Sequence, residues 1–182
     1  MTPEIDLVTN PTFTEDLASR DMDELRAMRT RCQSIENSLS YVRRLIQGRL
    51  DIVGGEAQRR RDGGASGDTS DLIGRLPDIL SDGSRSDGGP GSVRPPQAME
   101  PDQAVTNQLE ARLDAAISAD QLGKVADLSD EDLSAAVIAL NELEDSVSQS
   151  RRDLHGAIDT LQGEVTRRYR TGEASVDGLL KS

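Results

Sequence analysis

The segment ENSLSYVRRLIQGRLD at residues 36–51 recurs as EDSVSQSRRDLHGAID at residues 144–159. In both copies five polar residues follow one another at spacings of 4, 3, 4 and 4, with His replacing Gln in the second copy. We call each row a polar stripe. The stripes consist of Glu36, Ser40, Arg43, Gln47 and Asp51, and of Glu144, Ser148, Arg151, His155 and Asp159. These spacings keep the five side chains within an arc of about 80° on an α-helix, so each stripe occupies one helix face.

An apolar seam accompanies each stripe. The seam residues recur at alternating spacings of 3 and 4, as in a coiled coil, with one extra spacing of 4 at the same place in both copies. The seams consist of Leu25, Met28, Cys32, Ile35, Leu39, Val42, Ile46, Leu50, Val53 and Ala57, and of Leu133, Ala136, Leu140, Leu143, Val147, Ser150, Leu154, Ile158, Leu161 and Val165. The segments GEAQRR (55–60) and GEVTRR (163–168) continue the match, so an internal duplication is the simplest explanation.

The geometry of the two helices decides how the stripes combine. Each stripe residue follows a seam residue by one, so it points about 100° away from the seam, onto the broad face of a two-helix ribbon. Antiparallel pairing puts both stripes on the same face and builds one pseudo-twofold site about 22 Å long. Arg43 and Arg151 stand mid-stripe, so we expect them near the axis, where their repulsion favours an anionic ligand with twofold symmetry.

The composition divides the chain into six segments. The expected segments are a flexible arm (1–20), a long helix (21–61), a disordered linker (62–101), a short helix and connection (102–126), a second long helix (129–170) and a frayed tail (171–182). Asp21 with Glu24, and Ser129 with Asp132, are typical of helix starts. The linker is rich in Gly, Ser, Asp and Pro. We interpret its small apolar island, within 70–82, as a transient turn. The island consists of Leu72, Ile73, Leu76, Ile79 and Leu80.

The short helix is expected to begin at Pro101 and to carry one apolar row. The row consists of Val105, Leu109, Leu113 and Ile117, which recur at every fourth position. Such a row can contact a partner protein or cover the coil, and we favour partner contact.

The overall composition limits the classes of function. The 182 residues carry a formal net charge of -12, and only 35% are hydrophobic and 2% aromatic, which suits paired helices better than a large globular core. The acidic balance argues against direct nucleic-acid binding and suits a basic partner. Cys32 is the only cysteine and is expected in the core, and His155, the only histidine, is not expected to hold a metal. Neither a signal peptide nor a bilayer-spanning run is expected, so we expect a cytoplasmic all-α protein.

The duplicated stripe resembles the RsiG family, the actinobacterial anti-sigma factors that bind cyclic di-GMP. The first stripe matches the pattern E-x3-S-x2-R-x3-Q-x3-D at all five positions, and the second departs from it only at His155. The resemblance implies an antiparallel coiled coil that carries two cyclic di-GMP molecules on its ten stripe residues. It also implies that the loaded protein sequesters the sporulation sigma factor WhiG and represses its transcription.

The residue types of the stripe suit this ligand. Arginine offers forked donors to a phosphate or to the O6/N7 edge of guanine, and aspartate accepts the N–H groups of the Watson–Crick edge. The serines, Gln47 and His155 can bond phosphate, ribose or base, while Glu36 and Glu144 can accept from a base or hold an arginine. Because His155 is shorter than Gln and can become charged, the second half-site is expected to bind differently.

Two other classes of function compete with this interpretation. A ligand-free coiled-coil adaptor explains the seams but leaves the duplicated stripe without a cause. An all-helical enzyme resembling chorismate mutase would also gather Arg, Gln and Glu around an anion. Such sites usually add lysine, however, and the only lysines, Lys124 and Lys181, lie outside the long helices. With no nucleophile–base pair evident, we do not expect an enzyme.

Overall fold

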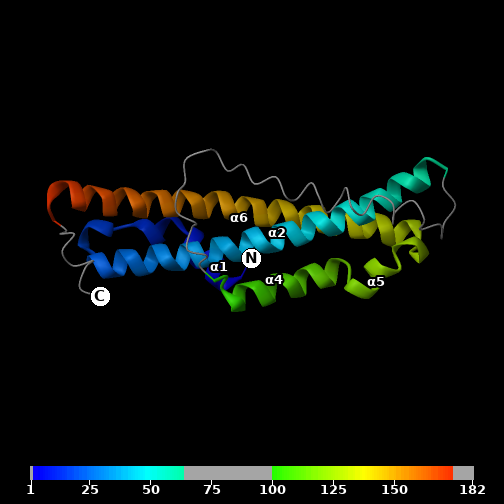
Figure 1. Ribbon diagram of the computed structural model, residues 1–182, viewed down its shortest axis with the longest axis horizontal. Coiled ribbons are helices and arrows are strands. Elements are labelled where there is room, and N and C mark those ends of the chain that lie inside the picture. Colours follow the sequence, from blue (N-terminus) through cyan, green and yellow to red (C-terminus); the bar gives the residue numbers. More distant parts are fainter. Residues whose placement is uncertain (1, 64–99, 174–182) are drawn as a thin grey trace, which may run out of the picture.

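The computed structural model describes residues 2–63 and 100–173, and within these ranges every regular element is helical (Figure 1). The elements are α1 (Pro3–Thr9), η1 (Pro11–Thr14), η2 (Leu17–Ser19), α2 (Met22–Arg61), α4 (Gln103–Ala116), α5 (Ala119–Gly123), η3 (Val125–Asp127) and α6 (Asp130–Thr171), where η denotes a short 3-10 helix. The long helices α2 and α6 lie side by side and run in opposite directions. The predicted all-α antiparallel pair is therefore confirmed. The predicted apolar island lies outside the described residues, as do the predicted linker except at its two ends and most of the tail.

Both long helices begin at the predicted caps. The Asp21 carboxylate accepts from the backbone N–H of Glu24 at 2.7 Å, and the Glu24 carboxylate accepts from the N–H of Asp21, which completes a capping box. At the start of α6 the Ser129 hydroxyl accepts from the N–H of Asp132 at 3.1 Å. These bonds satisfy amides that have no partner within the first turn of a helix.

The predicted seams form the core between α2 and α6. Seven residues of the first seam and nine of the second are buried, including Ser150, and the remaining seam residues are half-buried. Leu50 and Ile158, which follow the extra spacing of 4, are among the half-buried ones, since the helices drift out of register there. Cys32 lies within the core as expected, where burial raises the pKa of its thiol to about 11.

The prediction that residues 1–20 form a flexible arm is wrong. Thr2 caps α1 by accepting from the N–H of Ile5, Pro3 occupies the first helical position, and Ile5 and Val8 are fully buried against the core. Leu17 in η2 is also buried. A two-helix ribbon has a back face that must be covered, and this short segment buries Ile5, Val8 and Leu17 in the core.

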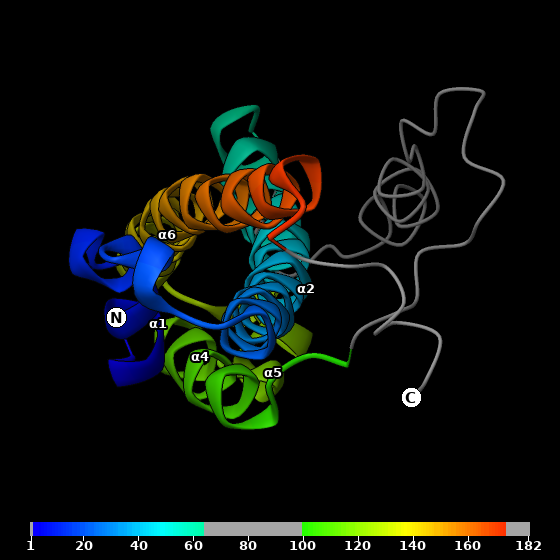
Figure 2. The same cartoon turned by 90° about the vertical axis from the view of Figure 1, so that its left-hand side faces the viewer.

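The prediction that the short-helix row contacts a partner is also wrong. Its four members are between 0% and 1% exposed and belong to the core, because α4 packs on both long helices. The helix is capped by Asp102 rather than started by Pro101. The Ser38 hydroxyl and the Arg49 guanidinium of α2 hold α4 through its backbone carbonyls. Both side chains point about 160–180° away from the stripe on α2, so α4 covers the back of the pair (Figure 2).

The duplication extends to the ends of the long helices. Arg60 of α2 bonds the carbonyls of Val125 and Ala126 in η3, which leads into α6. Arg168 of α6 bonds the carbonyls of Leu17 and Ala18 in η2, which leads into α2. These four carbonyls are equivalent under the same 108-residue shift that relates the stripes. We call these contacts the end clamps, since each ties the end of one long helix to the start of the other.

A glutamate completes each end clamp. Glu56 accepts from Arg59 and Arg60 at 2.6–2.7 Å and is fully buried, and Glu164 accepts from Arg167 and Arg168 at 2.8 Å. The hydrogen bonds from Arg167 and then Arg168 lower the pKa of Glu164 from 4.5 to about 2. The sequence motifs GEAQRR and GEVTRR therefore encode the clamps.

Acid is expected to weaken the Glu164 clamp. A carboxylate whose pKa is depressed in the folded state contributes stability that is present above the unfolded value of 4.5 and is lost as the pH falls towards about 2. Replacing Glu164 with Gln should therefore destabilise the protein at pH 7 but make progressively less difference down to pH 2.5, as measured by urea unfolding. The exposed Glu142→Gln is the control. A gap between wild type and Glu164→Gln that is independent of pH would contradict this account.

Candidate functional site

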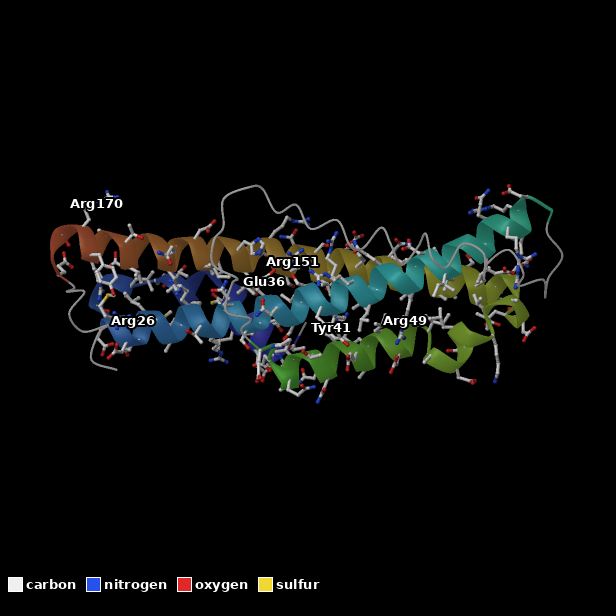
Figure 3. The ribbon with its side chains drawn as sticks, viewed as in Figure 1. Arg26, Glu36, Tyr41, Arg49, Arg151 and Arg170 are labelled. Carbon is white, nitrogen blue, oxygen red and sulfur yellow. The ribbon has the colours of Figure 1, made fainter. Side chains whose placement is uncertain are left out.

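The two polar stripes meet on one face of the antiparallel pair, as the sequence predicted. Glu36 of α2 accepts from Arg151 Nη2 of α6 at 3.1 Å, and Glu144 of α6 accepts from Arg43 Nε of α2 at 2.8 Å (Figure 3). We call these contacts the crossed pairs, because each joins the start of one stripe to the middle of the other. They are equivalent under the duplication and define a pseudo-twofold axis across the ribbon.

The serine of each stripe completes its crossed pair. The hydroxyls of Ser40 and Ser148 donate to the glutamate four residues earlier, Glu36 at 2.7 Å and Glu144 at 2.9 Å. The spacing of four places serine and glutamate on the same helix face one turn apart. The Ser148 oxygen also accepts from Arg43 at 2.9 Å. The site therefore has a polar, hydrogen-bonded centre.

The environment of Glu36 keeps it charged. Burial alone would raise the pKa of this carboxyl, but hydrogen bonds from Ser40, Arg151 and His155 outweigh burial and hold the pKa below its ordinary value. His155 Nε2 lies 3.3 Å from Glu36 Oε1, so the histidine that replaces glutamine adds a contact within its half-site. The charged Glu36 in turn holds the Arg151 guanidinium in one orientation.

The expected repulsion between the two arginines is not found. The contacts place the pseudo-twofold axis between Glu36 and Arg43, close to Ser40 and Ser148. Each arginine then stands about 5 Å along the helix from the axis, from the rise of 1.5 Å per residue. Each guanidinium is also neutralised by a glutamate of the other helix. The expectation that the two charges require an anion between them is therefore wrong, because it considered the arginines without the glutamates that face them.

Apart from His155, which contacts Glu36, the outer members of the stripes lie away from this centre. Gln47 is half-buried, while Asp51, His155 and Asp159 are exposed. Because the axis lies near Ser40, the stripes overlap only between Glu36 and Arg43, and their outer ends extend in opposite directions. The composite face is then about 35 Å long at 1.5 Å per residue, longer than the expected 22 Å.

The sequence predicts that Glu36 and Glu144 can hold an arginine but does not say which one, although a signal for the crossed pairs exists. Glu and Arg are seven residues apart in both stripes, and an antiparallel register that centres on the midpoint of this interval brings each Glu opposite the other helix's Arg. The spacing alone cannot distinguish this register from one in which the two helices are shifted along each other. The end clamps, which tie the end of each long helix to the start of the other, are consistent with only one register.

One known protein family matches most of the chain. A family model described as RsiG-like matches residues 11–80 and 119–182, which include both stripes and both end clamps. The chain belongs to the RsiG-like family. This is a family of regulatory anti-sigma factors rather than of enzymes. No curated protein matches the chain significantly.

Neither a membrane span nor a metal centre is found in residues 2–63 and 100–173 of this family member. No helix in these ranges is long and apolar enough to cross a bilayer. The same ranges contain no group of three or more His, Cys, Asp or Glu side chains arranged to hold a metal ion.

Proposed function

We propose that this chain is an anti-sigma factor that sequesters a WhiG-type sigma factor when cyclic di-GMP occupies the composite stripe face. The crossed pairs carry the proposal, because they hold two guanidinium groups in equivalent positions on one open face. Membership of an anti-sigma factor family supports the class of partner.

The arginines supply the contacts to phosphate and guanine. Arg43 directs its Nε to Glu144 and Ser148, and Arg151 directs Nε and Nη2 to Glu36. A guanidinium has five N–H donors, so within the described residues each arginine keeps terminal donors for a ligand. The crossed pairs orient the guanidinium planes before the ligand arrives, which lowers the entropy lost on binding.

The outer stripe residues suit the bases. Asp51 and Asp159 are exposed acceptors about 12 Å along the helix from the arginines of their own stripes, and a carboxylate can accept from the Watson–Crick N–H groups of guanine. Gln47 and His155 lie between Asp and Arg and can bond ribose or phosphate. Two ligand molecules related by the pseudo-twofold axis would use both half-sites, with His155 making the second one different.

Ligand binding is expected to strengthen sigma-factor binding. The ligand adds two phosphate charges per molecule to a chain of formal net charge -12, and a sigma factor carries basic surfaces for promoter DNA. By linkage, the sigma factor must then strengthen ligand binding by the same factor. Isothermal titration calorimetry of the sigma factor with and without cyclic di-GMP measures the coupling, with cyclic di-AMP as the control nucleotide. Equal affinity in all three titrations would exclude a ligand-dependent anti-sigma factor.

A further inference from the structure

A hollow of about 410 Å³ lies between the C-terminal end of α2 and the N-terminal end of α6. Gly54 of α2 and Ser134 and Val137 of α6 are among its lining residues. Gly54 follows Asp51 by three residues, and Val137 precedes Glu144 by seven, so both point in the same direction as the stripes. The hollow therefore continues the stripe face beyond the end of the first stripe.

The equivalent position at the other end of the molecule is filled. The duplication maps the hollow residues Gly54, Arg61, Ser134 and Val137 onto Gln162, Tyr169, Arg26 and Arg29. Arg26 Nη2 donates to the Tyr169 hydroxyl at 2.7 Å, and Arg29 Nη1 donates to Gln162 Oε1 at 2.6 Å. These long side chains bridge α2 and α6 across the stripe face. The pseudo-symmetry is thus broken, with one end open and the other closed.

The chemistry of the open end suits an apolar side chain of the partner. Ala57, Leu133 and Val137 give the hollow apolar walls, and Ile138, the residue after Val137, is 57% exposed. Among the charged residues of the lining, Arg60 and Asp130 form an ion pair with each other, so this pair does not require a charged occupant. An apolar side chain would therefore fill the hollow and contact its apolar walls.

We propose that the hollow receives an apolar side chain from a helix of the sigma factor and so fixes the direction in which the partner lies on the stripe face. The inference rests on the proposed function, because the sigma factor is its occupant. A face with two equivalent ends would accept the partner in either direction. One open and one closed end leave a single direction, although the ligand site beneath has pseudo-twofold symmetry.

Filling the hollow tests the proposal. A Cβ atom added at Gly54 meets nothing within 4 Å, so Gly54→Gln introduces the side chain found at the closed end without a clash. Replacing a glycine in the interior of a helix also favours folding. Gly163→Gln is the matched control, since it makes the same change in α6, where a Cβ atom likewise meets nothing. Val137→Arg is a second variant, which introduces the residue of the closed end from the other helix.

Fluorescence anisotropy with labelled sigma factor, in the presence of cyclic di-GMP, measures the effect. We expect Gly54→Gln and Val137→Arg to weaken sigma-factor binding at least about tenfold, as when a central apolar anchor is blocked. Cyclic di-GMP affinity should stay within about twofold, the melting temperature of Gly54→Gln should not fall, and Gly163→Gln should bind as wild type. Sigma-factor binding within twofold of wild type in both hollow variants would overturn the proposal.

Light scattering distinguishes the sigma factor from a second copy of this chain as the occupant of the hollow. If filling the hollow converts a dimer to a monomer and leaves sigma-factor binding unchanged, the occupant is a second copy and the proposal is overturned. If the wild-type protein does not bind the sigma factor even with cyclic di-GMP, the proposed function is contradicted. The inference, which rests on that function, is then contradicted as well.

Photo-cross-linking reads the direction in which the sigma factor lies. The cross-linking residue replaces Arg61 at the open end or, in a separate variant, Tyr169 at the closed end. Cross-links to the sigma factor should form from position 61, and equal yields from both positions would overturn the single direction.

Discussion

The double variant Arg43→Ala/Arg151→Ala is expected to weaken cyclic di-GMP binding a hundredfold or more. Each guanidinium supplies charge-assisted hydrogen bonds, and losing such a contact costs about 1.5–3 kcal/mol, so two together exceed two factors of ten. The single variants should each lose about tenfold. Isothermal titration calorimetry gives the affinities, and circular dichroism should show unchanged helix content, because the seams are untouched.

The crossed pairs require a particular control for these variants. Removing Arg43 also leaves Glu144 without its ion pair, and an uncompensated carboxylate would itself repel a phosphate. The variant Arg43→Ala/Glu144→Gln removes both charges and shows how much of the loss is due to repulsion. Arg44→Ala, at the exposed residue beside the stripe, should bind as wild type. Unchanged affinity in both arginine single variants would exclude the stripe face as the ligand site.

Replacing Glu56 with Met is expected to destabilise the protein by about 3 kcal/mol. The carboxylate is fully buried and accepts from Arg59 and Arg60, whose side chains are only 11% and 12% exposed. Removing one partner of a buried ion pair leaves uncompensated charge, which typically costs about 3–5 kcal/mol, and the remaining contact of Arg60 with Asp130 reduces the loss. Urea unfolding measures the change, and a fall in melting temperature of about 10 °C should accompany it.

The exposed Glu142→Met is the matched control for this change, and it should stay within about 0.5 kcal/mol of wild type. Because the Glu56 clamp holds η3 against the end of α2, the lost stability should appear as faster hydrogen exchange at the start of α6. If the free energy of unfolding falls by less than about 1 kcal/mol, the side chains of Arg59 and Arg60 can rotate into solvent at little cost. The end clamp would then contribute little to holding the helices together.

The sequence predicted the long helices and the stripe face because both depend on local periodicity. No knowledge of tertiary packing is needed to recognise the caps at Asp21 and Ser129, the seam spacings or the repeat. Antiparallel pairing followed from the requirement that equivalent stripes share a face. The RsiG-like family model matches residues 11–80 and 119–182, which contain both repeat segments.

The remaining features depend on tertiary register, which periodicity does not specify. Val105 and its row are apolar at helical spacing whether they meet a partner or the core, so sequence could not choose between these outcomes. Ile5 and Val8 are too few to form a recognisable amphipathic helix before their contact with α6 is known. The crossed pairs and the hollow arise only when residues far apart in the sequence, on α2 and α6, are placed opposite one another.

The covered back of the helix pair has a consequence for stoichiometry. The short helices α1 and α4 pack on α6 and α2, and α4 lies opposite the stripes, so the crossed pairs face away from it. A protein whose capture depends on the stripe face can then approach only from the front. Each chain is expected to sequester no more than one such protein. The number of copies of this chain in the cell would then limit how many partner molecules can be sequestered.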